Sequence, residues 1–202
     1  RKLQDGPSSL LAGALDMLSE VRIDQKRFDE AETLALETEQ MYAKVYGPWH
    51  NYRAFGLVHL GVARLGKKDG PGSLAAFTEA LELRRAAFGD EHRDTANSLS
   101  NLGGAEVELG DAAAGEKHLR EALAISQRVM PAEHVAIPRM RLKLIPALIA
   151  QQKNEEAADE VRKAQAELER AHDTTPGDRA TLRKLTDSLA EKKTAPGAII
   201  AH

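Results

Sequence analysis

The sequence contains no cysteine and few aromatic residues. Without cysteine, disulfides, thiolate nucleophiles and Cys-ligated zinc sites are excluded. Aromatic residues make up only 4% of the chain, so a core must be built largely from Leu, Ala and Val. The longest apolar stretch, residues 144–150, contains Pro146 and is far shorter than the ~20 residues that a membrane-spanning helix needs. We therefore expect a globular protein that does not insert into membranes.

The chain also lacks a large excess of either charge. Its 28 basic and 31 acidic residues give a net charge of −3 over 202 residues. Nucleic acids and anionic membranes favour proteins with a basic face, so we expect neither as a partner. No signal peptide is visible, and we expect a cytoplasmic location. The chain begins with Arg1 rather than Met, as expected for a piece of a longer protein.

Side chains of the same kind recur along the chain at a constant interval. Three histidines, His50, His92 and His134, follow one another every 42 residues. The same interval aligns an apolar position and a position of small residues in four copies. These positions are Leu18, Leu60, Leu102 and Leu144, and Ala31, Ser73, Gly115 and Ala157. Such self-similarity indicates a repeat architecture.

Each copy is predicted to consist of two helices joined by a turn. Leu57 and Leu60 lie on one face of a first helix, because apolar residues three or four positions apart share a helix face. Asp111 and Asn154 are predicted to cap the second helices of the third and fourth copies. The sequence therefore predicts four helix–turn–helix repeats. They span about residues 9–46, 51–88, 93–130 and 137–172.

The residues after the fourth copy predict a capping helix at about 176–192. Thr175 is its expected N-cap, and Pro176 suits the first helical position. Leu182, Leu185 and Leu189 form one apolar stripe, which a cap would place on the last repeat. Residues 1–193 are thus expected to form a single domain, with the stub of a preceding helix at residues 1–4 and a flexible tail at residues 194–202.

Two Leu-Gly pairs, Leu60-Gly61 and Leu102-Gly103, occur in the first helices of the middle copies. Together with the small residues of the second helices, this pattern resembles the tetratricopeptide repeat. It is most similar to the 42-residue variety found in kinesin light chains and many bacterial proteins. The resemblance implies an all-α, right-handed α-solenoid of about four repeats with a C-terminal capping helix, and a non-catalytic module that binds a protein or peptide.

No residue pattern in the chain indicates catalysis, a cofactor or a metal. The three repeated histidines lie at least one helix-packing distance (~8–10 Å) apart, too far to share one ion. Each is predicted to pack or to form a hydrogen bond in its loop. His59 and His118 are expected to be ordinary helix residues without a matching partner. The loop Gly66–Gly72 lacks the ending of a phosphate-binding loop and is predicted to be a turn.

The resemblance also implies a binding surface, because in the family the first helix of each pair lines a concave groove. The positions transferred to this sequence are Phe55, Val58, Val62, Asn97, Ser100, Gly104, Arg139 and Leu142. They predict an apolar side, a polar middle and a basic end. Phe55, Val58 and Leu142 could equally be core residues between repeats. The basic cluster of Arg139, Arg141 and Lys143 is either a solvated helix flank or a rim that binds an acidic peptide.

Three functions follow from these patterns. We prefer a protein-interaction scaffold that binds a segment of its partner in the groove. The alternative is an accessory region of a larger bacterial signalling protein, such as a Ser/Thr kinase or a transcription regulator. The third function is a helical-repeat protein that binds nucleic acid, which the near-neutral charge of the chain disfavours. Family members that bind chaperone tails carry Asn directly after the first-helix Gly. Here Glu20, Val62, Gly104 and Pro146 occupy those positions, so no carboxylate clamp is expected.

Overall fold

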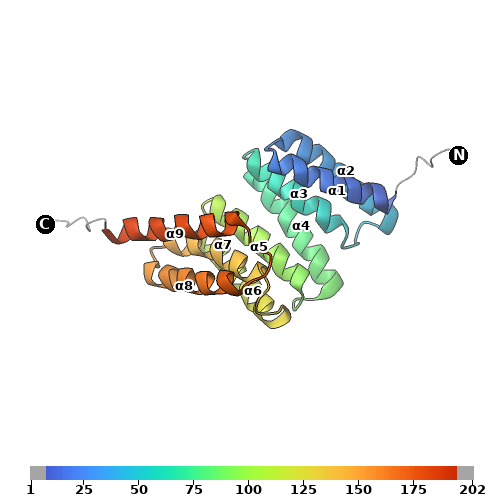
Figure 1. Cartoon of the computed structure of the whole chain (residues 1–202). Helices are drawn as coiled ribbons and strands as arrows, with labels where there is room; N and C mark the ends of the chain where they lie inside the picture. The colour runs from blue at the N-terminus through green and yellow to red at the C-terminus, as the bar shows by residue number, and fades with distance from the viewer. Residues whose placement is uncertain (1–7, 195–202) are drawn as a thin grey trace.

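The computed structural model describes residues 8–194 and shows a series of helical hairpins (Figure 1). Within these residues the chain forms nine helices and no strand, which confirms the predicted all-α class. The helices are α1 (Ser9–Asp24), α2 (Phe28–Tyr46), α3 (Arg53–Gly66), α4 (Gly70–Phe88), α5 (Arg93–Glu108), α6 (Ala112–Val129), α7 (Ala136–Ala150), α8 (Asn154–Arg170) and α9 (Pro176–Thr194). The predicted stub at residues 1–4 and nearly all of the predicted tail lie outside the described residues.

The hairpins stack so that the first helix of each pair forms an inner layer. Every helix packs on the next one along the chain. In addition, α1 contacts α3, α3 contacts α5, α5 contacts α7 and α7 contacts α9. The second helices of the described hairpins make no such contacts with one another. Packing of this kind produces a helical-repeat solenoid whose first helices line one side.

The 42-residue interval is visible in the backbone of the turns within the hairpins. Lys26, Lys68, Gly110 and Gln152 are each 42 residues apart, and all have a positive φ, at 57°, 66°, 96° and 62°. Only Gly110 adopts this left-handed conformation without a steric cost from a Cβ atom. The same turn is therefore imposed by the helix packing at each repeat, and not by glycine alone.

Side-chain caps begin several of the helices. The Asp111 carboxylate accepts a hydrogen bond from the Ala114 amide at 3.0 Å, as predicted. The prediction for Asn154 was wrong, because Lys153 occupies the N-cap position of α8 and Asn154 is the first helical residue. The buried Oδ1 atom of Asn154 has no hydrogen-bond partner among the described residues. Without a side-chain cap, the free amides of this helix end must be satisfied by other groups.

The Leu-Gly pairs let the two helices of a hairpin approach closely. A Cβ atom on Gly61 would lie 2.8 Å from the ring of Phe77, and one on Gly103 would lie 2.9 Å from Leu119. Close approach also lets the Ser73 hydroxyl donate to the Gly61 carbonyl at 2.8 Å. A larger residue at either glycine would therefore push its hairpin apart.

A continuous core extends from α4 to α9. It contains fully buried residues such as Leu99, Leu119 and Leu148. A smaller core cluster joins α2, α3 and α4. By contrast, Ala12 and Ser19 are the only buried residues of α1. Across residues 8–194, none of the helices has the length and apolarity that crossing a membrane requires.

Candidate functional site

A hollow of about 600 Å³ lies on the side formed by the first helices. Helices α1, α3, α5 and α7 all contribute to its wall, and α4 adds one residue. The lining residues are Glu20, Val58, Arg84, Asn97, Ser100, Asn101, His134, Val135, Ala136, Arg139, Met140 and Lys143. A polar floor with an apolar flank and charges of both signs suits a segment of polypeptide better than a small apolar ligand.

The predicted groove residues do not all reach this hollow. Val58, Asn97, Ser100 and Arg139 line it. Phe55 lies outside the lining set and keeps 43% of its surface exposed. Val62 is partly buried against the core. Gly104 lies beside the hollow, where a Cβ atom would be 3.5 Å from the Lys143 side chain.

Leu142 has a different place from the one predicted. It is only 6% exposed and belongs to the core cluster. Its neighbours on α7, Met140 and Lys143, line the hollow instead. A shift of one or two residues along a helix turns a side chain by about 100–200°, which explains why a transferred position can face the core. We therefore leave Leu142 out of the candidate surface.

Arg84 is a buried cation in the wall of the hollow. It is 9% exposed, and its Nη1 atom donates to the Ser98 hydroxyl at 3.0 Å and to the Asp94 carbonyl at 3.4 Å. Its guanidinium lies 5.6 Å from the centre of the Phe55 ring. No carboxylate of the described residues lies within 4.0 Å of it. Burial lowers the pKa of Arg84 in spite of the nearby Asp94 and Asp16.

Arg84 also interrupts the repeat. The equivalent positions, 42 residues apart, hold Tyr42, Ser126 and Leu168. All three are buried and uncharged. A charge at this position is therefore not required by the packing of the hairpins. The sequence contained this signal, because the 42-residue alignment alone identifies Arg84 as the exception.

Lys143 is the second cation of the hollow. Its Nζ atom donates to the Asn101 side chain at 3.2 Å and approaches the Ser100 carbonyl at 3.5 Å. Although more than a third of the residue is exposed, the walls of the concave surface surround it, and this desolvation lowers the pKa of the ammonium group. Within residues 8–194 it forms no ion pair closer than 4.0 Å. Two cations without carboxylate partners thus face the same space.

The other members of the basic cluster are already paired. Arg139 holds Asp178 of α9 with two hydrogen bonds of 2.9 Å, which raise the pKa of Arg139. Arg141 is 3% exposed and pairs with Glu160 and with Glu167, the latter at 2.6 Å. Its burial opposes the charged form, but the hydrogen bonds that it donates to the two carboxylates outweigh that cost and raise the pKa.

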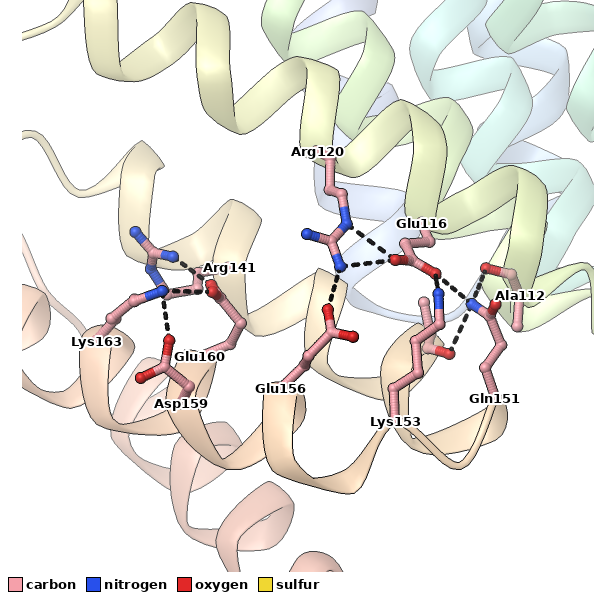
Figure 2. A network of polar contacts seen from close by, with 11 residues as sticks. Ala112, Glu116, Arg120, Arg141, Gln151, Lys153, Glu156, Asp159, Glu160 and Lys163 are labelled. Atoms are coloured by element: carbon pink, nitrogen blue, oxygen red, sulfur yellow. Dashed lines mark hydrogen bonds and ion pairs between the residues drawn. The ribbon is translucent and has the colours of Figure 1, made fainter.

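Figure 2 shows Arg141 at one end of a row of polar contacts between α8 and its neighbours. At the other end, the buried Glu116 carboxylate accepts hydrogen bonds from Arg120, Gln151 and Lys153 (Figure 2). The contacts of Glu116 with Gln151 and Lys153 fasten the fourth hairpin to the third, while the pairs of Arg141 join α7 to α8 within the fourth. Their cations are satisfied within the chain and do not face the hollow, so we assign them a structural role.

A cluster of aromatic rings lies beside Phe55. Neighbouring rings of the cluster have centres between 4.7 and 6.5 Å apart, and its members are Tyr42, Tyr46, His50, Tyr52 and Phe55. All three tyrosines and the single tryptophan of the chain occur within residues 42–52. The prediction missed this cluster, although the uneven distribution of so few aromatics could have revealed it. Through Phe55 and Arg84 the cluster is continuous with the wall of the hollow.

The repeated histidines have the structural role that was predicted. In each loop the Nδ1 atom accepts a hydrogen bond from the amide two residues later, at 3.2 Å for His50, 3.1 Å for His92 and 3.1 Å for His134. The expectation that His59 and His118 lack partners was wrong. The imidazole of His59 lies 2.8 Å from Asp16, and that of His118 lies 2.6 Å from Glu106.

The first pair joins two inner helices, because Asp16 lies on α1 and His59 on α3, and the second joins the two helices of one hairpin, because Glu106 lies on α5 and His118 on α6. Among the residues that the structure describes, no three His, Asp or Glu side chains gather in an arrangement that could hold a metal ion.

Comparison with known proteins finds a family match in the middle of the chain and several structures of similar fold. Residues 53–128 match the tetratricopeptide repeat family. The fold is similar to that of BtubC (BKLC) from P. vanneervenii, with a TM-score of 0.71 and 19% identity over 86% of this chain and 70% of that one. A putative kinesin light chain from Podospora anserina with nearly identical TPR-like repeats also has a TM-score of 0.71, with 16% identity over 95% of this chain and all of that one.

The apo form of RapI is a further structure with a similar fold. Its TM-score is 0.67, with 16% identity over 90% of this chain and 53% of that one. No curated protein matches the sequence. The matched residues identify tetratricopeptide repeats in the middle of the chain, and the shared fold is consistent with a tetratricopeptide repeat protein of the kinesin light chain-like kind.

Proposed function

We propose that this protein is a non-catalytic scaffold that binds an extended segment of another protein in the concave hollow. Tetratricopeptide repeats generally mediate interactions between proteins, which supports the general role. The finer proposal is that the bound segment carries a carboxylate group, held by Arg84 and Lys143. The observation that carries it is Arg84, a buried cation that faces an open hollow without a carboxylate partner.

The physical argument starts from the cost of burying a charge. Removing a guanidinium from water without an opposite charge costs several kcal/mol. The position of Arg84 is occupied by uncharged residues in the other repeats, so the array does not need this cost for its packing. An incoming carboxylate would offset the cost through charge-assisted hydrogen bonds, which are stronger than neutral ones. The site would then already have the geometry that the bound state requires.

The other residues that line the hollow determine the orientation in which the peptide segment is expected to bind. Val58, Met140 and Ala136 offer apolar contacts, while Asn97 and Asn101 can bond to the backbone of an extended chain. Glu20 of α1 also lines the hollow and would repel a carboxylate at its own end. The acidic residue of the ligand is therefore expected near α5 and α7, with a neutral or basic part near α1.

The test uses a displayed library of random peptides selected on the wild-type chain, followed by calorimetric titration of the best peptide. We expect acidic peptides, and replacement of their acid by the matching amide should weaken binding roughly tenfold, since a hydrogen bond to a charged group contributes about 1.5–3 kcal/mol. Lys143→Gln should do the same. Arg120→Gln, which alters a cation outside the hollow, should bind like the wild type.

A peptide that binds equally well with and without its acid, or equally well to Lys143→Gln, would contradict the carboxylate site. Arg84→Gln extends the test if circular dichroism shows that the variant folds. Lys143→Gln keeps the proposal testable if it does not, because the lysine makes only two polar contacts within the described chain.

A second proposal is that this chain serves as a regulatory repeat region of a larger signalling protein. The similarity to RapI favours it, because the similar part spans only about half of that chain, 53%. The residues encoded immediately before Arg1 would decide this question. A kinase or DNA-binding sequence there would support the proposal, and a start codon directly before Arg1 would contradict it.

A further inference from the structure

Helix α1 exposes an apolar face along its whole length. Leu10 is 85% exposed, Met17 is 70% exposed and Val21 is 45% exposed. Together with the exposed Ala14, these residues follow one another at intervals of four, three and four positions. Residues so spaced lie on one side of a helix. The stripe therefore forms one continuous surface, separate from the residues that line the hollow.

Part of the equivalent face is buried in the later repeats, although the counterparts of Met17 in α5 and α7, Asn101 and Lys143, line the hollow. Leu18 is 39% exposed, whereas its counterparts Leu60, Leu102 and Leu144 are 4%, 6% and 1% exposed. The counterpart of Ala14 is Gly56, where a Cβ atom would lie 2.7 Å from the backbone of α2. The later repeats thus bury the part of this face that corresponds to Leu18 and Ala14. The α1 face has the shape and apolarity to receive a helix.

We infer that the α1 face binds the α1 helix of a second copy of this chain, in an antiparallel pair related by a two-fold axis. In such a pair the same patch serves both partners. An axis at the middle of the stripe places Leu10 opposite Val21 of the second copy, and Ala14 opposite Met17. The small Ala14 thus receives the larger Met17. Leu11 and Leu18, which are 46% and 39% exposed, lie along one edge of this row, opposite Glu20 and Gly13 of the second copy.

The charges at the ends of α1 favour the antiparallel arrangement. The first turn of α1 contains no acidic residue, and its free amides carry the positive end of the helix dipole. Asp24 is the last residue of the helix and is exposed. In the antiparallel pair, Asp24 of each copy lies beside the first turn of the other. A parallel pair would bring like ends together instead.

The exposed area sets the strength of the pair. The five large apolar residues of the face, Leu10, Leu11, Met17, Leu18 and Val21, offer on the order of 500 Å² per copy. Two copies would bury about 1,000 Å², at the lower end of specific protein interfaces. We therefore expect a reversible dimer with a dissociation constant of roughly 10–100 µM. The hollow stays open in this dimer, because the stripe contributes none of its lining residues.

Sedimentation velocity across a range of about 5 to 300 µM tests the proposal. The average mass should rise from 22.0 kDa towards twice that value for the wild type. Met17→Glu should remain a monomer, because it places a charge beside the axis. Val129→Glu, which alters a residue of α6 that is 40% exposed, should associate like the wild type. A wild type that stays monomeric, or a Met17→Glu variant that still associates, would overturn the inference.

Residues 1–7 directly precede α1 and are the competing occupant of the face. A chain that is monomeric as a whole and associates only after their removal would place them on the stripe and overturn the inference. The register has its own test, because the native chain has no cysteine. Leu10→Cys mixed with Val21→Cys should form a disulfide under mild oxidation much faster than either variant alone. Equal rates in all three samples would overturn the antiparallel pairing.

Discussion

The two ends of the array meet solvent in different ways. At the carboxyl end, α9 lies on α7 and α8 with Leu189 only 5% exposed, and its exposed residues include Arg179 and Arg183 (Figure 1). At the amino end, α1 leaves Leu10 and Met17 more than two-thirds exposed. The interior repeats bury their apolar faces against one another. The difference shows that closing an end requires a dedicated helix, which only the carboxyl end of the described chain has.

The carboxyl cap is also held by specific polar contacts. Asp178 accepts two hydrogen bonds from Arg139 of α7 and one each from the amide and the hydroxyl of Thr175. The predicted Thr175 N-cap is present, since the Asp178 amide donates to its hydroxyl at 3.3 Å. The cap is thus attached to the repeat that it covers as well as packed on it. Within residues 8–194, no helix is attached in this way to the outer face of α1.

The largest expected effect compares one repeat position at the two ends. Leu144→Ala removes a side chain that is 1% exposed and should lower the free energy of unfolding by about 3 kcal/mol, the usual cost of a core cavity. Leu18→Ala removes the equivalent side chain, 39% exposed, and should cost less than about 1 kcal/mol. Urea unfolding followed by circular dichroism measures both. Equal losses would mean that the α1 face is covered.

The next effect concerns the ion pair of the cap. Hydrogen bonds from Arg139 lower the pKa of Asp178 to about 2, below the ~3.9 of an unfolded chain. A lowered pKa stabilises the fold above pH ~4, and this contribution is lost as the pH falls towards 2. Because Arg139 is 42% exposed, we discount the full value and expect Asp178→Asn to cost about 1–2 kcal/mol at pH 7.

The pH dependence separates this pair from other carboxylates. Between pH 4 and 2, the wild type should lose stability relative to Asp178→Asn, until the two unfold alike. Hydrogen exchange should show the loss first in α9. Asp187→Asn, which alters an exposed carboxylate on the same helix, should follow the wild type at every pH. A difference between wild type and Asp178→Asn that does not change with pH would contradict the role of the ion pair.

The smallest effects concern the left-handed turns. Gln152 holds a φ of 62° and Gly110 a φ of 96° at the same position of successive repeats. Gln152→Gly should relieve the strain of a Cβ atom and stabilise the chain by about 0.5–1 kcal/mol, while Gly110→Ala should cost about 1 kcal/mol. Ala113→Gly, in the helix after the turn, should destabilise, because glycine there only loosens the helix. A loss of stability in Gln152→Gly would contradict the explanation that the Cβ atom strains this left-handed turn.

Much of the fold could be predicted because its information is local and repeated. The interval between His50, His92 and His134 fixes the period, and apolar spacing within each copy identifies both helices. The cap at Asn154 was wrong because Lys153 and Asn154 are both compatible with a helix start, and a one-residue difference in the boundary decides between them. The left-handed turns at Lys68 and Gln152 carry no sequence signal of their own.

The site was harder to predict because it depends on contacts between distant residues. Arg139 appeared free to bind a ligand, but it pairs with Asp178, 39 residues later, once α9 packs on α7. Arg141 is likewise taken by Glu160 and Glu167 of α8. Only Lys143 of that cluster remains without a carboxylate. Arg84 was missed because it lies on a second helix, whereas the family pattern directs attention to first helices.

The most direct test of the account is to locate a bound acidic peptide by NMR in the Met17→Glu chain, which keeps α1 from pairing. Amide and methyl shifts should change at Val58, Ser100 and Lys143 and stay constant along the outer face of α8. In a chain that carries both Met17→Glu and Lys143→Gln, the shifts should not reach saturation over the same range of peptide concentration. Shifts confined to α1 or to the outer helices, or unchanged binding without the lysine charge, would contradict the claim that the concave hollow holds the partner's carboxylate.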